Sequence, residues 1–273
     1  MPEILSAGEL LWNSLIFRRM SHPEQLAFIG YARSLVSSEV TLGKVLEVGS
    51  FDVNGTIRQI IGECQEYVGA DLVSGPGVDV VKSGHLLEFA DGYFDLSFSS
   101  ECFEHDAHWA ESIVNMVRMT KPGGAVVFSC ASKGRPEHGT MRSSPRLSPG
   151  TQAIGSDYYR NLEASDFEHT LVMNTLFSDY RFYYQPVTWD LYFIGRVSDG
   201  KEDVRPALPS ADEINLVTAI TPLVHRMART PLYVLLKLLP VRVYNQLAYR
   251  YWRLLEKVGN SLFRGRFMRF DKN

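Results

Sequence analysis

The chain has 273 residues, 45% of them apolar and 22% charged, and its formal net charge at pH 7 is −3. A chain of this length and composition can bury a full hydrophobic core, which excludes an intrinsically disordered protein. The net charge hides an asymmetry, because 11 Lys and Arg residues follow position 220, against only Glu256 and Asp271. Residues 221–273 thus carry about +9, and the preceding residues about −12.

Cysteine usage and the N-terminus favour a reducing compartment. The three cysteines, Cys64, Cys102 and Cys130, form no C-x-x-C pair, so neither a disulfide framework nor a zinc site is expected. The start, MPEILSAGELLWNSL, has acidic residues where a signal peptide carries positive charge. No apolar run reaches the roughly 18 residues of a membrane-spanning helix. We therefore expect a cytoplasmic protein without a transmembrane anchor.

The first 40 residues show helical spacing in two blocks. The second block, QLAFIGYARSLV, follows a capping-box pattern that runs from Ser21 to Glu24. We expect residues 1–40 to form an N-terminal helical lid.

From Lys44 onward, short apolar runs alternate with helical stretches: VLEV, TIRQIIGE, EYVGAD, YFDLSFSS, ESIVNMVRMT and AVVFSCA. This alternation is typical of an α/β fold, in which helices cover both faces of a doubly wound, mostly parallel sheet. The segment RFYYQPVTWDLYFIGRV contains two aromatic-rich runs broken at Gln185 and Pro186. It predicts an antiparallel hairpin that closes the sheet near Val197. The sheet domain is expected over residues 41–198.

Residues 199–214 are polar, contain two prolines and predict a linker, and residues 215–273 predict a basic amphipathic helical tail. Pro231 and Pro240 are expected to bound the first short helix of the tail. Three basic residues share one side of the next helix: Arg250, Arg253 and Lys257. Such a helix can lie on an anionic membrane surface, or pack against the domain or a second subunit in a homodimer. Nucleic acid is disfavoured as a partner, because the acidic main domain repels phosphate.

The stretch VLEVGSFDVNG, residues 45–55, places glycines at the end of the first strand. Ligands of open α/β sheets bind at the carboxyl ends of the strands, and Gly49 would let the backbone approach such a ligand. Gly55 precedes TIRQII and is expected to open a helix whose free N–H groups face the site. The dinucleotide fingerprint G-x-G-x-x-G is absent, since Phe51 replaces its second glycine, and this disfavours a nicotinamide enzyme.

Two acidic residues flank this turn, Glu47 within the first strand and Asp71 at the end of the second. A carboxylate in the position of Asp71 accepts hydrogen bonds from ribose hydroxyls, whereas a diphosphate near Glu47 would be repelled. A nucleoside that carries an ammonium and a sulfonium group satisfies both requirements. S-adenosylmethionine is such a molecule.

The order of the motifs resembles that of class I S-adenosylmethionine-dependent methyltransferases of the small-molecule type. The resemblance covers roughly residues 40–198 and rests on strand-E-x-G, YVGAD, LLEFADGYFDLSFSSECFEH, MTKPGGAVVFS and DLYFIGRV. It implies a seven-stranded Rossmann-like methyltransferase sheet with helical additions at both ends. It also implies an enzyme whose cofactor is S-adenosylmethionine.

The resemblance further implies which residues bind the cofactor. Those at the methionine end are Glu47, Gly49, Ser50, Asn54, Gly55, Ser100 and Glu101. Those at the adenosine end are Asp71 for the ribose, Leu72 against the adenine, and Ser83, Gly84 and His85 near the adenine amine. This chain departs from many relatives at Ser83, which replaces an acid, and at Phe51 and Val53, which replace glycines.

Methyl transfer is an in-line displacement at a sulfonium, and a neutral alcohol acceptor must also lose its proton. Histidine titrates in the right range for this role, and the candidate bases are His138, His105 and His108. His105 and His108 stand three residues apart beside Glu104 and Asp106. A metal site is conceivable there, but we expect none, and polar packing is the alternative to catalysis.

The stretch from Ser132 to Phe167 joins the fifth strand to the next helix with three prolines, four glycines and many hydroxyl groups. A connector of this length is either functional or disordered, and a solvated lid is the alternative to a substrate site. The acceptor-binding candidates in it are Arg135, Glu137, Tyr158, Tyr159 and Arg160. Aromatic rings stack on sugar faces, and Arg binds phosphate or carboxylate groups in a fork.

Together these features predict an O-methyltransferase that acts on a sugar hydroxyl in glycan or polysaccharide biosynthesis. The alternatives are methylation of a small carboxylate, a phenol or a lipid, and a non-catalytic scaffold that binds the cofactor.

Overall fold

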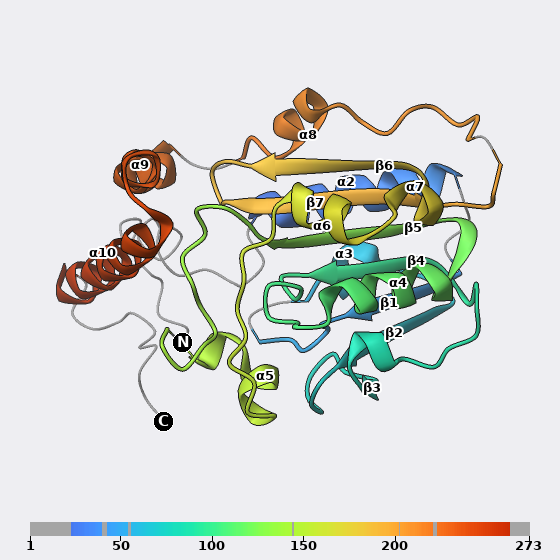
Figure 1. The fold of residues 1–273 in the computed structure, drawn as a ribbon, viewed down its shortest axis with the longest axis horizontal. Helices are drawn as coiled ribbons and strands as arrows, with labels where there is room; N and C mark the ends of the chain where they lie inside the picture. Colours follow the sequence, from blue (N-terminus) through green and yellow to red (C-terminus); the bar gives the residue numbers. More distant parts are fainter. Residues whose placement is uncertain are drawn as a thin grey trace, which may run out of the picture.

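The computed structural model describes residues 23–39, 43–53, 56–143, 145–201, 203–220 and 223–262. They form one seven-stranded sheet with helices on both faces and two long helices at one end (Figure 1). The strand order is β3-β2-β1-β4-β5-β7-β6. The strands are β1 (Lys44–Val48), β2 (Glu66–Asp71), β3 (Val80–Val81), β4 (Phe94–Ser100), β5 (Thr120–Ala131), β6 (Phe177–Gln185) and β7 (Asp190–Val197).

The directions of the strands confirm the predicted fold. β1 to β5 run parallel, while β7 lies antiparallel between β5 and β6. The predicted hairpin forms β6 and β7, with the break at Gln185 and Pro186 in the turn between them. Parallel strands are buried on both faces, which explains their nearly continuous apolar runs.

Alternate side chains of each strand enter two separate cores. Val45, Leu96 and Val127 face the core that is covered by α2 (Pro23–Glu39), α3 (Arg58–Ile61) and α8 (Ala211–Val217). Leu46, Val126 and Phe193 face the core on the other side. That core is covered by α4 (Trp109–Met119), α6 (Ala164–Thr170) and α7 (Met173–Leu176). This two-sided burial keeps the strand ends in register, and the strand ends carry the site.

The N-terminal region is described only from α2 onward, so the first of its two predicted helices lies outside the described residues. α2 packs on the sheet through Phe28 and Ile29. The Gln25 amide donates hydrogen bonds to the hydroxyls of Ser100 and Ser129, at 2.5 and 2.6 Å. The first turn of α2 therefore contacts the carboxyl ends of β4 and β5, beside the cavity described below.

α8 begins inside the segment that was predicted as a linker. Its start is a capping box, in which the Ser210 hydroxyl accepts from the Glu213 amide and the Glu213 carboxylate accepts from the Ser210 amide. This pattern satisfies two backbone groups at once and defines the first turn. The linker proper is therefore shorter than residues 199–214.

The tail consists of α9 (Leu223–Leu238) and α10 (Val241–Leu262), which pack against each other. Pro231 lies inside α9, so the prediction that it bounds this helix was wrong, and the break comes at Pro240. A proline inside a helix removes one backbone hydrogen bond, and tertiary packing can offset that loss. Leu232 is fully buried and the Arg229 guanidinium donates to the carbonyl of Val187 at 2.7 Å.

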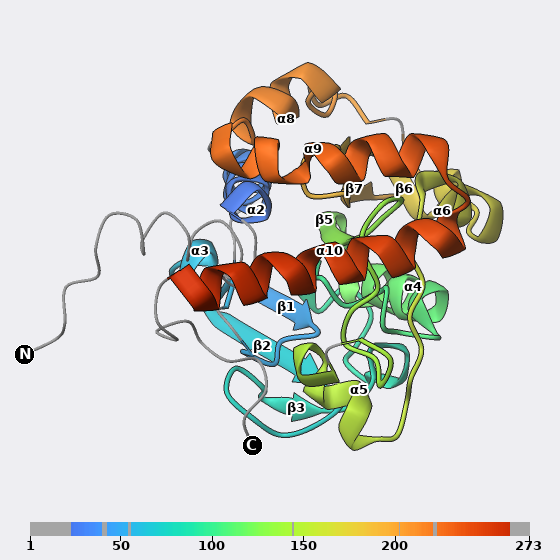
Figure 2. The same cartoon turned by 90° about the vertical axis from the view of Figure 1, so that its left-hand side faces the viewer.

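Figure 2 shows α10 lying across this end of the molecule, with α9 above it. Among the described residues, no helix has both the length and the apolar composition needed to cross a membrane.

Candidate cofactor-binding and active site

A cavity of about 380 Å³ opens at the carboxyl ends of β1, β2 and β4. The predicted cofactor residues that line it are Glu47, Gly49, Ser50, Asp71, Leu72, Ser83, Gly84, His85, Ser100 and Glu101. Asn54 and Gly55 lie outside the described residues. Side chains from four separate strand ends and loops thus meet at one cavity, as expected for an open α/β sheet.

The turn after β1 requires glycine. Gly49 has a φ of +84°, and a Cβ at this position would lie 2.6 Å from the Cβ of Cys102. Its N–H donates to the carbonyl of Ala70 at 2.8 Å, which ties the turn to the end of β2. The following helix, α3, begins only at Arg58 and has four residues, too few for a helix terminus that binds anions.

Asp71 is held in place by backbone donors. Its carboxylate accepts hydrogen bonds from the amides of Phe51, at 3.1 Å, and Leu72, at 2.7 Å. Burial raises its pKa above the ordinary value. An ionised carboxylate offers about four lone pairs, so two acceptor positions stay available to ribose hydroxyls.

Glu47 is 4% exposed and accepts a hydrogen bond of 2.6 Å from the Tyr67 hydroxyl. Burial raises its pKa to about 7, against the opposing effects of Tyr67 and Arg58. A carboxylate with this pKa is partly protonated at neutral pH. A cation bound beside it would stabilise the ionised form, which burial has deprived of hydration.

His85 and His108 both line the cavity and contact each other. The Ser83 hydroxyl lies 2.8 Å from Nδ1 of His85, and the rings of His85 and His108 pack with centroids 4.2 Å apart. His108 is exposed. His108, one of the three predicted bases, therefore lies beside His85, a residue predicted to bind the adenine.

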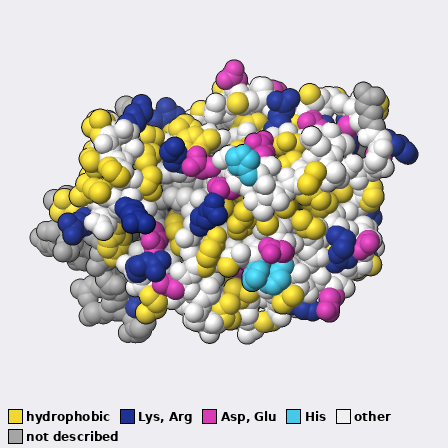
Figure 3. Space-filling model, in the orientation of Figure 1, with side chains coloured by type: hydrophobic (Ala, Val, Ile, Leu, Met, Phe, Trp, Pro, Cys, Tyr) yellow, Lys and Arg dark blue, Asp and Glu magenta, His cyan; other side chains and the backbone are white. Residues whose placement is uncertain are grey.

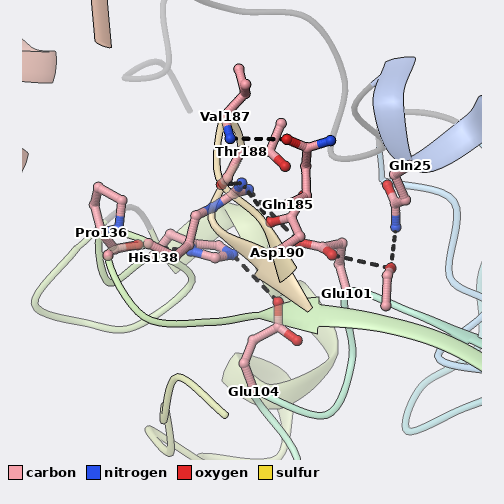
Figure 4. Close-up of polar contacts among 12 residues, drawn as sticks. Gln25, Glu101, Glu104, Pro136, His138, Gln185, Val187, Thr188 and Asp190 are labelled. Carbon is pink, nitrogen blue, oxygen red and sulfur yellow. Dashed lines mark hydrogen bonds and ion pairs between the residues drawn. The ribbon is translucent and has the colours of Figure 1, made fainter. Parts of the chain in front are cut away.

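A buried group of ionisable side chains, here called the polar cluster, lies behind the ends of β4 and β5 (Figure 4). Its members are Glu101, Glu104, His105, Arg135, His138, Tyr159 and Asp190. Arg135 donates to Asp190 at 3.0 Å and to the carbonyl of Thr188 at 3.0 Å, and its other nitrogen lies 3.7 Å from Glu101. Burial raises the pKa of all three carboxyl groups. One guanidinium cannot neutralise three buried carboxylates.

His105 and His138 form the side of the cluster that is nearest the cavity. His105 lines the cavity, whereas His138 lies behind it, with the two ring centroids 5.1 Å apart. Burial lowers the pKa of His105 to about 4 and that of His138 well below its ordinary value. Both imidazoles are therefore neutral at pH 7, as a proton acceptor must be.

The long connector folds over the cavity and contributes residues that the sequence analysis did not single out. It contains two short helices, η2 (Pro145–Leu147) and α5 (Pro149–Ala153). A Cβ at Gly150 would lie 2.9 Å from Oδ1 of Asp71, so α5 closes directly over the predicted ribose position. Additional cavity residues from the connector are Leu147, Ser148, Pro149, Gly150, Thr151, Ile154 and Ser156. The Pro149-Gly150 pair is the local sequence signal for this turn. The contact between α5 and the end of β2 leaves no periodic pattern in the sequence, because the two segments are distant in the chain.

Most of the charged acceptor-binding candidates are paired within the protein. Glu137 lies 2.8 Å from the Arg142 guanidinium, and Arg160 pairs with Asp166. Arg135 belongs to the polar cluster. The Tyr159 hydroxyl donates to Asn161 at 2.8 Å, while Tyr158 is partly exposed.

The fold, the acidic cavity and the glycine turn have the features expected of an α/β protein that binds a nucleoside derivative at its strand ends. Residues 47–128 match a family model described as a methyltransferase domain. This match covers 82 of the 273 residues, from β1 into β5, and it agrees with the order of motifs that resembles class I S-adenosylmethionine-dependent methyltransferases.

Several solved structures are similar to this chain. One is the Burkholderia thailandensis 1,6-didemethyltoxoflavin-N1-methyltransferase with bound 1,6-didemethyltoxoflavin and S-adenosylhomocysteine, at 16% identity and TM-score 0.45 over 63% of this chain and 79% of that one. Another is the N-methyltransferase NodS from Bradyrhizobium japonicum with S-adenosylhomocysteine. It has 15% identity and a TM-score of 0.43, over 70% of this chain and 99% of that one. A third is an arsenic(III) S-adenosylmethionine methyltransferase from Chlamydomonas reinhardtii. It has 16% identity and a TM-score of 0.41, over 64% of this chain and 76% of that one. A search of curated protein sequences found no significant match.

Proposed function

We propose that the protein is an O-methyltransferase that acts on a sugar hydroxyl in glycan or polysaccharide biosynthesis. The observation that supports this most directly is the polar cluster, which places neutral imidazoles and buried carboxyl groups at one wall of the cofactor cavity. A hydroxyl acceptor needs such groups because its proton must leave during the reaction.

The cavity residues suit the cofactor in charge and hydrogen bonding. Glu47 would pair with the ammonium group, and Asp71 would accept from the ribose hydroxyls. The hydroxyl of Ser50 is buried and has no hydrogen-bond partner among the described residues, so a ligand in the cavity would satisfy it. Leu72, Ser83, Gly84 and His85 would surround the adenine, and Ser100 and Glu101 the methionine portion.

When bound, S-adenosylmethionine supplies a methyl group on a positively charged sulfur. The protein must then align an acceptor oxygen with that carbon, exclude water and receive the hydroxyl proton. His105 lines the cavity and is the imidazole of the cluster that could receive the proton of such a hydroxyl, while His138 and Glu104 lie behind it. The connector with α5 would exclude water from above.

The pairing of the charged candidates favours a neutral acceptor rich in hydroxyl groups. An anionic acceptor would have to break the ion pairs of Arg135 or Arg160, which are already satisfied. Tyr158 is partly exposed in the same connector and offers an aromatic surface for a sugar ring. A small carboxylate is therefore a weaker acceptor candidate than a sugar hydroxyl.

The tail favours a cytoplasmic protein that binds the inner face of a membrane peripherally, where lipid-linked glycans are assembled. Its inner side packs on the domain through Leu232, Tyr244 and Ala248. Its outer side exposes apolar residues, Val234, Leu238, Val241 and Val243, together with the basic residues Lys237, Arg242 and Arg250. Figure 3 shows hydrophobic and basic side chains gathered at this end of the molecule. The alternative partner for this surface is a second copy of the chain.

Product analysis by mass spectrometry tests the proposed reaction. The purified protein is incubated with S-adenosylmethionine and a panel of nucleotide sugars and polysaccharide precursors, with phenols, small carboxylates and amphipathic lipids as separate arms. We expect a mass gain of one methyl group on a sugar hydroxyl. Methylation confined to the phenol, carboxylate or lipid arm would contradict the proposal, as would cofactor binding without turnover of any acceptor in the panel.

A further inference from the structure

Three side chains of the polar cluster converge on one point. Glu104 and His105 follow β4, and His138 comes from the connector after β5. One ligand atom from each lies within 4.8 Å of the other two. His138 follows His105 by more than 30 positions, and the neighbouring ends of β4 and β5 bring it close to the other two.

Two of these three side chains lack hydrogen-bond partners among the described residues. Glu104 is fully buried, and no described group forms a hydrogen bond of normal geometry with either of its carboxylate oxygens. His105 is 6% exposed, and neither of its ring nitrogens has a partner in the same part of the chain. Buried polar atoms without partners are rare in folded proteins, and each one indicates a missing water, ion or ligand.

The hydrogen bond of His138 indicates which kind of group would fit between His138 and Glu104. A carbonyl oxygen only accepts, so Nδ1 of His138 must donate its proton to the carbonyl of Pro136, 3.1 Å away. In a neutral ring, Nε2 then carries a lone pair, and this atom faces the Glu104 carboxylate at 3.9 Å (Figure 4). Two acceptors that face each other at this distance need a shared donor or a cation between them, and the second imidazole, His105, beside them favours a metal ion over a water. Metal-binding histidines typically donate their second nitrogen to a carbonyl in this way.

The surroundings hold the three groups in position. The Tyr159 ring packs edge-on against both imidazoles, with centroid distances of 5.2 Å to His105 and 5.1 Å to His138. A Cβ at Gly139 would lie 2.6 Å from the His105 ring, so the backbone of the connector presses directly on it. These contacts restrict both rings before any ion binds.

We propose that Glu104, His105 and His138 bind a first-row divalent metal ion at the edge of the cofactor cavity. Two imidazoles and one carboxylate suit Zn²⁺, Mn²⁺, Fe²⁺ or Co²⁺, whereas Mg²⁺ prefers oxygen ligands. Ligands at about 2.1 Å from a tetrahedral ion are roughly 3.4 Å apart, so the side chains must move inward by about 1 Å. Three protein ligands leave at least one coordination position for another molecule.

The proposed metal site adjoins the cavity, so a molecule in the cavity could occupy the free coordination position. His105 belongs to both the cavity wall and the ligand set. A metal ion there would bind an acceptor hydroxyl and lower its pKa, so that the proton could pass to solvent water, and His105 and His138 would then serve as metal ligands and not as bases. This role rests on the proposed function, whereas the binding of the metal does not.

Metal titration of the untagged protein tests the site without any acceptor. After treatment with EDTA and its removal, we expect one equivalent of Co²⁺ to bind and produce visible absorption bands, and Zn²⁺ to displace it. Zn²⁺ should also raise the melting temperature of the wild type. Mg²⁺ at the same concentration should do neither. A wild-type protein that binds no Co²⁺ or Zn²⁺ would overturn the proposal and leave the methyltransferase function untouched.

Matched variants assign the ligands. Glu104→Gln keeps the size of the side chain and His138→Ala removes one imidazole, and each should weaken Co²⁺ binding at least tenfold. His169→Ala removes an exposed histidine in α6 and should bind Co²⁺ like the wild type. Binding of S-adenosylhomocysteine by each variant reports a correct fold. Undiminished Co²⁺ affinity in Glu104→Gln would exclude this carboxylate as a ligand.

Discussion

Glu47 is buried and lines the cavity, and we expect its ionisation to affect what the cavity binds. Its pKa lies near 7 instead of the ordinary 4.5, because burial disfavours the carboxylate. Between about pH 4.5 and pH 7, Glu47 is protonated in the folded protein and ionised in the unfolded chain. The stability of the folded protein therefore falls as the pH rises through this range. A residue that costs stability at working pH is more consistent with a role in binding than in structure.

The affinity for S-adenosylhomocysteine should rise as the pH increases from 6 to 8, because the ligand ammonium needs the ionised carboxylate of Glu47. Glu47→Gln should weaken binding about tenfold at pH 8 and flatten this dependence, since an amide cannot form the charged pair. Isothermal titration calorimetry at several pH values measures both effects. The variant should be at least as stable as the wild type at pH 8. A pH dependence that persists in the variant would assign the titration to another group, such as Asp71.

At the scale of secondary-structure elements, the connector after β5 and the tail depend on each other. The Tyr244 hydroxyl of α10 donates to the carbonyl of Gly134 at 2.6 Å, and Leu232 of α9 packs beside Trp189 at the hairpin turn. The connector carries His138, so the tail supports the segment that completes the polar cluster. Packing against the domain was one of the alternatives expected for the tail, and the structure shows this contact.

Leu232→Ala should destabilise the protein by about 2–5 kcal/mol, because it leaves a cavity between α9 and Trp189. Leu238→Ala in the same helix is the control, since Leu238 is 72% exposed and its truncation should change stability by less than about 0.5 kcal/mol. Urea unfolding of both variants, with limited proteolysis of the tail, measures the difference. Equal behaviour of the two variants would mean that α9 does not dock on the domain as described.

At the scale of the whole molecule, charge is divided between an acidic main domain and a basic tail, with about −12 before residue 221 and about +9 after it. Electrostatic attraction between the two parts favours the docked tail. The outward basic side chains, including Arg242 and Arg250, stay available to an anionic surface. The docked tail therefore keeps a basic side exposed, and the proposed membrane contact would use that side.

The protein should cosediment with vesicles that contain phosphatidylserine at low salt, and not with neutral phosphatidylcholine vesicles. Reversing Arg242 and Arg250 together to Glu should weaken this binding by at least about 25-fold, at roughly 1 kcal/mol for each basic residue removed. Lys201→Glu, in the exposed linker, should have little effect. Vesicle binding that is unchanged by the double reversal would contradict the membrane role. Sedimentation as a dimer in the absence of vesicles would instead favour a second copy as the partner.

The sequence by itself determined the α/β sheet, the hairpin, and the glycine and acidic residues at the ends of β1 and β2, while the resemblance added further cavity residues. These follow from local rules: alternating apolar runs, a glycine with positive φ after β1, and acids at two strand ends. In an open parallel sheet the carboxyl ends meet at one edge, so Glu47, Asp71 and Glu101 could be brought together from strand order alone.

Tertiary structure alone decided which histidines meet, where the connector lies and how the tail packs. His105 and His108 are three residues apart in sequence, yet His108 packs on His85 and His105 on His138. Pro231 marks a helix end by local rules, but burial of Leu232 against Trp189 keeps α9 continuous through it. Such contacts join segments that are distant in the chain, and their free energy depends on shape and burial that no local pattern encodes.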